Sequence, residues 1–232
     1  MKREVTNIVN GFRLVPGDTY LEDVGSGEYE EFRRFYERQV RPDPYAAVRD
    51  RAMLKIAYDR PTGIVSLDPN QSYFQSYSAN DSDGGRVRVF HRIDESLLAN
   101  SLFRRVFNCD TAYINEYCDR VGKRSANISV HFIRYKADQG GASYSSPVWL
   151  HLDDEPLVFI HLVQLSANAI GADSVISEMD SKPTNVFRLT RPFDTLIVDR
   201  MKKHAVTPLG STGGTAYREV MLVNLESGAQ QK

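Results

Sequence analysis

Hydrophobic and polar positions follow two different patterns in the two halves of the chain. In the first half, residues 28–40 place apolar side chains at steps of three and four, which predicts an amphipathic helix. A second helical pattern covers 94–121, with Asp94 as its N-cap. A Gly-, Asp- and Ser-rich loop at 77–85 leads into 86–90, where charged and apolar residues alternate. This alternation predicts a short strand with Arg86 and Arg88 on one face.

After residue 127 the apolar residues gather in short runs rich in Val, Ile, Phe and Thr, separated by Gly and Pro. Strands are expected near 128–136, 148–151, 157–165, 174–177, 185–189, 195–198, 205–208 and 217–225. About eight short strands without long helices between them favour an antiparallel barrel or jelly roll over a parallel α/β sheet. We therefore predict a mainly β protein with flanking helices (α+β). It would form a single domain, 1–232, with a mixed helical part at 1–127, the main strands at 128–226 and a tail at 227–232.

Composition restricts the classes of partner. Lys and Arg number 29 against 30 Asp and Glu, so the net charge of -1 favours neither nucleic acid nor a membrane surface. No secretory signal is visible, and the longest apolar run is too short for a membrane helix. Cys109 and Cys118 would lie about 13 Å apart on the second helix, too far for a disulfide. These features indicate a cytoplasmic protein with a small-molecule partner, and they leave its oligomeric state open.

Candidate chemistry centres on two histidines and a carboxylate. His151 and Asp153 are two residues apart, so on extended backbone they point to the same side. His204, at the start of a later predicted strand, would supply a third ligand. Two imidazoles and one carboxylate leave three positions open on an octahedral ion, as in non-haem Fe(II) oxygenases, with room for a 2-oxo acid and O2. By itself the H-x-D pair more often marks an ordinary hydrogen-bonded histidine.

A second feature lies fourteen residues after His204. Arg218 interrupts an otherwise apolar strand, and an arginine inside a barrel needs an anionic partner. The distal carboxylate of 2-oxoglutarate would provide one through a bidentate contact. Alternatively, Arg218 pairs with a protein acid such as Glu226, or lies on the outer face of the sheet.

Several runs together resemble one known family. They are Tyr-Phe-Gln-Ser at 73–76, Asp-Gly-Gly-Arg-Val-Arg at 83–88, Ile-Arg-Tyr-Lys at 133–136, and the longer runs 145–156 and 204–210. Over about residues 73–225 the chain resembles the bacterial Fe(II)/2-oxoglutarate-dependent dioxygenases of free amino acids, the isoleucine 4-hydroxylase type. The resemblance implies a double-stranded β-helix, the cupin-like jelly roll.

The resemblance also implies roles for single residues. His151, Asp153 and His204 fall on the iron ligands, and Arg218 falls on the 2-oxoglutarate anchor. Related halogenases lack the carboxylate ligand, so Asp153 favours hydroxylation. We add Thr207 and Arg134 as candidate cosubstrate contacts, although Arg134 fits an outer-face charge equally well.

The resemblance implies Fe(II), 2-oxoglutarate and O2 as cofactor and cosubstrates, and hydroxylation of an unactivated C–H bond of a free aliphatic L-amino acid, such as isoleucine or leucine. The products would be the hydroxy amino acid, succinate and CO2. Arg86 and Arg88 are candidates for the substrate carboxylate, and Asp154 and Glu155 for its ammonium group. All four have ordinary alternatives, as solvated charges or as partners that orient His151. A lysine-like substrate or another small metabolite, a non-oxidative cupin enzyme and a binding-only jelly roll remain the competing hypotheses.

Overall fold

One large sheet, here called the major sheet, organises the molecule. The computed structural model describes residues 8, 10–81 and 83–227, so the predicted tail beyond residue 227 lies outside the described residues. Nine described strands form the sheet, and their pairing is antiparallel except between β3 and β7. The order is β1 (Phe12–Val15), β13 (Thr195–Asp199), β9 (Leu157–Leu165), β16 (Ala216–Leu225), β8 (Ser125–Ala137), β3 (Ala46–Asp59) and β2 (Arg41–Asp43), with β4 (Ile64–Leu67) and β7 (His91–Arg92) also paired to β3.

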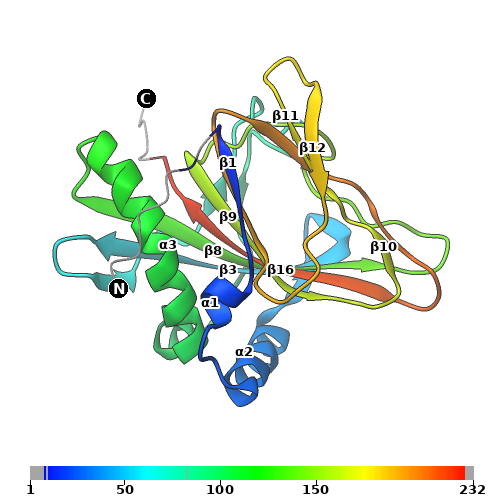
Figure 1. Ribbon diagram of the computed structural model, residues 1–232, viewed down its shortest axis with the longest axis horizontal. Helices are drawn as coiled ribbons and strands as arrows, with labels where there is room; N and C mark the ends of the chain where they lie inside the picture. The colour runs from blue at the N-terminus through cyan, green and yellow to red at the C-terminus, as the bar shows by residue number, and fades with distance from the viewer. Residues whose placement is uncertain (1–7, 9, 82, 228–232) are drawn as a thin grey trace.

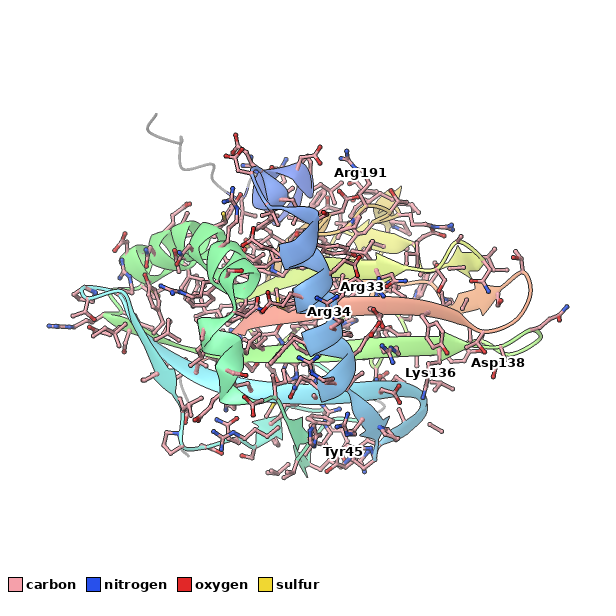
Figure 2. The ribbon with its side chains drawn as sticks, turned by 90° about the horizontal axis from the view of Figure 1, so that it is seen from below. Arg33, Arg34, Tyr45, Lys136, Asp138 and Arg191 are labelled. Carbon is pink, nitrogen blue, oxygen red and sulfur yellow. The ribbon has the colours of Figure 1, made fainter. Side chains whose placement is uncertain are left out.

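Helices cover the outer face of this sheet (Figure 1). They are α1 (Asp18–Leu21), α2 (Ser26–Gln39) and α3 (Ser101–Arg120), preceded by a 3-10 turn at Glu95–Ala99. Figure 2 shows α2 crossing the strands, with Phe32 and Tyr36 packed on the ring of Phe132 of β8. Both predicted helices are confirmed, but the second is divided. Asp94 caps the 3-10 turn, whereas Asn100 caps α3 by accepting a hydrogen bond from the Phe103 amide.

Shorter sheets cover the inner face, and we call them together the minor layer. The first sheet has three strands in the order β12 (Pro183–Phe187), β11 (Ser174–Ser177) and β14 (Lys203–Val206). The other two sheets have two strands each: β10 (Ala169–Gly171) with β15 (Leu209–Ser211), and β5 (Tyr73–Phe74) with β6 (Val87–Arg88). A core between the two layers includes Ile133, Val158 and Ile160 of the major sheet and Ile176 and Leu209 of the minor layer. The predicted jelly-roll class, mainly β with flanking helices, is confirmed.

Two local predictions were wrong, and one strand was missed. Residues 148–151 form no strand, and only His151 makes an isolated bridge. The strand expected at 86–90 is reduced to the two residues of β6, so Arg88 is buried while Arg86 is exposed. The fourteen-residue strand β3 was not expected at all. Both of its faces are covered, so it lacks the alternation that marks a half-exposed strand.

No helix in the described part of the chain combines the length and apolar character that crossing a membrane requires.

Candidate metal centre

His151, Asp153 and His204 come together at the edge of the minor layer. His204 lies on β14, while His151 and Asp153 lie in the loop between β8 and β9. Backbone hydrogen bonds of 3.1 and 3.0 Å join His151 and His204 in both directions. Their Nε2 atoms lie 3.5 and 3.3 Å from the two carboxylate oxygens of Asp153. One ligand atom from each residue therefore falls within 4.8 Å of the others, which is within reach of one metal ion.

The hydrogen bonds and charges of this triad suit a divalent cation. His151 Nδ1 donates to the Trp149 carbonyl at 2.7 Å, which leaves Nε2 free of its proton for a metal, a common arrangement in metal sites. Burial opposes ionisation of Asp153, but His204 and His151 outweigh it and hold the pKa of Asp153 well below its usual range. Burial likewise opposes protonation of His151, yet the hydrogen bond that protonated His151 donates to Asp153 raises the pKa of His151 overall. The site thus presents an ionised carboxylate between two imidazoles, the donor set preferred by Fe(II).

The triad opens into a cavity of about 80 Å³ between the two layers. Alternate residues of β3, β8, β9 and β16 point into it, because side chains two apart share one face of a strand. Its lining combines aliphatic and polar side chains, and we call the aliphatic part the aliphatic wall. The aliphatic wall comprises Ile133, Val158, Ile160, Val206, Val220 and Leu222, and the polar lining includes Arg49, Arg51, Tyr73, Gln75, Tyr135, Arg218 and Asn224.

Arg218 projects from β16 into this cavity as an uncompensated cation. The residue is only 4% exposed, its Nη2 has no hydrogen-bond partner, and its guanidinium lies 5.8 Å from the centre of the Tyr135 ring. Burial lowers the pKa of Arg218. Glu226, the protein acid considered as its partner, pairs instead with Lys55 at 2.8 Å. Arg218 is therefore placed to receive a carboxylate from a ligand.

Residues 35–224 match the family model described as 2OG-Fe dioxygenase. The chain belongs to this family. As a 2OG-Fe dioxygenase it uses Fe(II), 2-oxoglutarate and O2.

Two characterised relatives and one solved structure resemble this dioxygenase over nearly its whole length. L-isoleucine-4-hydroxylase of Bacillus thuringiensis is 36% identical over 218 residues, which cover 92% of this chain and 89% of the relative. The 3(1)-hydroxy-L-isoleucine 4-dioxygenase of Pantoea ananatis is 31% identical over 232 residues, with coverage of 95% and 94%. The crystal structure of IDO from Bacillus thuringiensis superposes with a TM-score of 0.79 at 29% identity, covering 95% of both chains.

Thr207 lies beside the Arg218 end of the cavity of the dioxygenase. A small adjoining hollow is lined by Thr207, Arg218 and Tyr135. The Thr207 hydroxyl accepts a hydrogen bond of 2.9 Å from the Asp173 amide, so its oxygen is fixed in place. Its position is compatible with the predicted contact to the cosubstrate.

Arg134, by contrast, is not brought to the site. It points to the face of β8 opposite Ile133 and Tyr135, and its Nε donates to Glu219 Oε1 at 2.5 Å. The alternative of a charge on the outer face describes it correctly. The strand period explains the difference, because neighbouring residues of a strand face opposite sides.

Arg86 and Arg88 also fall outside the cavity lining. The Arg86 side chain is half exposed and forms an ion pair with Asp83. Arg88 is buried, but it donates to Gln75 Oε1 at 2.7 Å and pairs with Asp83 at 3.3 Å. Both arginines are thus compensated within the loop that follows β5.

Asp154 and Glu155 support the metal-bearing loop instead of lining the cavity. Asp154 accepts hydrogen bonds from the Ser76 amide and hydroxyl at 2.5 and 2.8 Å. Glu155 accepts one from the Tyr73 hydroxyl at 3.0 Å. Burial, and next the charge of Asp153, raise the pKa of Glu155 to about 8. These contacts join the loop around β5 to the metal-bearing loop. Among the described contacts, neither acid hydrogen-bonds to His151, whose Nδ1 is held by the Trp149 carbonyl instead.

Sequence reasoning missed one charged residue of the cavity in particular, Arg51. It lies on β3, the strand that was not expected. The only sequence signal was a cluster of charges, Arg49-Asp50-Arg51, in front of an apolar run.

Proposed function

We propose that this dioxygenase hydroxylates an unactivated C–H bond of a free aliphatic L-amino acid, similar to isoleucine or leucine, and converts 2-oxoglutarate to succinate and CO2. One observation carries the proposal: the cavity joins the metal triad and the uncompensated Arg218 to an aliphatic wall. The two named relatives, an L-isoleucine-4-hydroxylase and a hydroxy-L-isoleucine dioxygenase, support the same substrate class.

The protein residues have separate tasks in this reaction. His151, Asp153 and His204 would hold Fe(II), which together with 2-oxoglutarate and O2 supplies the oxidising power. Arg218 binds the distal carboxylate of 2-oxoglutarate and so orients the cosubstrate toward the triad. The aliphatic wall excludes water and positions one C–H bond of the substrate. Asp153 occupies the ligand position that related halogenases leave open, which favours hydroxylation.

The lining of the cavity favours an apolar substrate side chain over a lysine-like one. Among the described residues that line it, Asp153 is the only acid, and it belongs to the metal triad. A second ammonium group would therefore enter without a carboxylate partner, and an unpaired buried charge is costly. Isoleucine- and leucine-like side chains would instead bury their methyl groups against Val158, Ile160 and Leu222.

The test is coupled turnover. The protein is loaded anaerobically with Fe(II) and 2-oxoglutarate, and O2 is then added with each member of a panel of free amino acids. We expect succinate release together with a product one oxygen atom heavier for isoleucine or leucine, and not for lysine. Succinate release that no amino acid couples to such a product would refute the proposal.

A cytoplasmic location belongs to the same proposal. Its support is that neither Cys109 nor Cys118 forms a disulfide, as is usual in a reducing compartment.

A further inference from the structure

Four arginines are buried in the described part of the chain, and three of them, Arg49, Arg51 and Arg218, line the cavity. Arg49 pairs with Asp43 at 2.5 Å, and Arg88 is compensated by Gln75 and Asp83. Arg218 has its role in binding 2-oxoglutarate. Arg51 remains: it is 6% exposed, it lines the cavity, and no described carboxylate forms an ion pair with it.

The guanidinium of Arg51 is held in a fixed orientation. Its Nη2 lies 3.0 Å from His131 Nδ1, and its Cζ lies 4.0 Å from the centre of the Phe90 ring and 5.2 Å from that of Tyr73. Because arginine only donates, His131 Nδ1 accepts, and the protonated Nε2 donates to Ser129 Oγ at 3.2 Å. Burial and the charge of Arg51 hold the pKa of His131 well below its usual value, so the ring stays neutral.

This support leaves the charge of Arg51 unneutralised. Tyrosine, phenylalanine and neutral imidazole contribute no negative charge, and the buried Nε of Arg51 has no acceptor. Burial lowers the pKa of Arg51 to about 10, yet the group stays protonated near neutral pH. A fixed, buried cation with an unused donor at a cavity wall is a receptor for an anionic ligand.

Arg51 and Arg218 are too far apart to form one continuous cationic patch. β8 lies between their strands, with Arg51 opposite Ile133 and Arg218 opposite Tyr135. Two strand spacings and a two-residue offset place their Cα atoms roughly 12 Å apart. Arg49, which also lies opposite Tyr135, is neutralised by Asp43. The cavity therefore has two separate uncompensated cations, Arg51 and Arg218, which suits two ligands that each carry a carboxylate.

We propose that Arg51 binds the α-carboxylate of the substrate and thereby restricts this dioxygenase to free amino acids, excluding amides, peptides extended at the C-terminus, and amines. The proposal rests on the proposed function and deepens it. It transfers to Arg51 the role that the sequence had suggested for Arg86 and Arg88.

The test is equilibrium binding to the full-length protein loaded anaerobically with Fe(II) and 2-oxoglutarate. Three ligands are compared: L-isoleucine, L-isoleucinamide and 2-methylbutylamine, which lacks the carboxylate. We expect the wild type to bind the acid about 10- to 100-fold more tightly than the amide, the usual range for a charged hydrogen bond. In Arg51→Gln the acid should bind no better than the amide, with the dissociation constant of 2-oxoglutarate unchanged.

Two further variants complete the design. Arg51→Lys keeps the charge but loses the planar guanidinium that donates two parallel hydrogen bonds to a carboxylate, so part of the preference for the acid should remain. Arg33→Gln removes a half-buried arginine of α2 that pairs with Glu30 and Glu37 on the outer face, and it should bind all three ligands as the wild type does (Figure 2).

Each outcome is decisive. If Arg51→Gln retains the preference for the acid, or loses affinity for 2-oxoglutarate instead, the assignment of Arg51 is wrong. If Arg51→Gln fails to fold, the wild type still decides, because equal binding of acid and amide overturns the proposal. Arg51-dependent selectivity without any coupled hydroxylation would refute the proposed function while leaving the carboxylate receptor in place.

Discussion

Asp153 contributes to the metal site more than to the core, so its substitution should separate metal binding from folding. Asp153→Ala removes one of the three proposed ligands, and even outer partners of metal ligands are worth 10- to 100-fold in affinity. At a metal concentration about 100 times the wild-type Kd, the wild type should gain about 2.7 kcal/mol of stability. A variant with 100-fold weaker binding gains only about 0.4 kcal/mol. Thermal unfolding with and without Fe(II) under anaerobic conditions measures both values.

The metal-free Asp153→Ala protein should still unfold in one cooperative transition. A variant that keeps the full stabilisation by Fe(II) would remove Asp153 from the ligand set, and loss of the cooperative transition would show that its role is structural.

Arg218 should show a trade-off between function and stability. Arg218→Met keeps much of the side-chain length but removes the charge, so 2-oxoglutarate binding should weaken by about 2 to 5 kcal/mol. Without ligands, the same change removes an uncompensated buried cation and should stabilise the protein, by about 1 kcal/mol or more. Titration with 2-oxoglutarate and urea unfolding of the ligand-free protein measure the two effects. Destabilisation together with unchanged affinity would mean that Arg218 serves the fold and not the cosubstrate.

At the scale of elements, the connection between two loops is the feature that most directly shapes the site. Asp154 accepts two hydrogen bonds from Ser76, and this joins the loop after β5 to the metal-bearing loop. Asp154→Asn replaces a charged acceptor by a neutral one, so the connection should lose about 1 to 3 kcal/mol. We expect faster amide exchange at Ser76 and a higher KM for the amino acid, with little change in the Kd of 2-oxoglutarate.

A matched control for Asp154→Asn is Asp180→Asn. Asp180 is exposed between β11 and β12 and pairs with Lys182 at 2.8 Å, far along the chain from both loops. Equal exchange rates at Ser76 in the wild type and Asp154→Asn would show that the two loops are held together by other contacts.

Elements also differ in how far their sequences reveal them. The helix at Ser26–Gln39 and the strand β9 were predictable, because one shows an apolar stripe and the other a long apolar run. β3 was not predictable, since Arg49, Arg51 and Lys55 face inward where a core strand would carry apolar residues. A strand that carries charged residues on its inner face loses the pattern by which strands are recognised.

The same contrast holds for the site. His151 and Asp153 are near neighbours in sequence, and Arg218 interrupts an apolar run, so both features could be seen without coordinates. The backbone bridge that aligns His151 with His204 depends on pairing between distant segments. The uncompensated state of Arg51 could not be predicted either, because it depends on which neighbouring side chains lack charge.

For the whole molecule, net charge hides a strongly uneven distribution. The chain carries a net charge of -1, which suggests no charged partner. The cavity, however, is lined by Arg49, Arg51 and Arg218, with Asp153 as the only acid among its described lining residues. The molecule concentrates positive charge where two carboxylate-bearing ligands would bind, and balances it elsewhere.

This concentration of charge predicts how stability depends on pH. His131 is fully buried, and its pKa is lowered first by burial and then by Arg51, Arg88, Lys55 and Arg49. Above pH 6.5, the ordinary pKa of histidine, His131 is neutral in both the folded and the unfolded state. In this range it therefore does not make the free energy of unfolding depend on pH. As the pH falls below 6.5, only the unfolded state takes up this proton, and the free energy of unfolding decreases. Through His131 alone, the free energy of unfolding then decreases by up to about 1.4 kcal/mol for each pH unit.

His131→Gln isolates this contribution from the other titrating groups. Glutamine can accept from Arg51 and donate to Ser129, as the neutral ring does, but it does not titrate. Urea unfolding of the metal-free protein between pH 8 and 5 should give similar stability for wild type and variant at pH 8. Below pH 6.5 the free energy of unfolding should decrease less steeply with falling pH in the variant than in the wild type. The two slopes should differ by close to the value for one bound proton, about 1.4 kcal/mol per pH unit. Parallel curves over the whole range would mean that His131 is protonated in the folded protein, and that Arg51 is then oriented without an acceptor at this position.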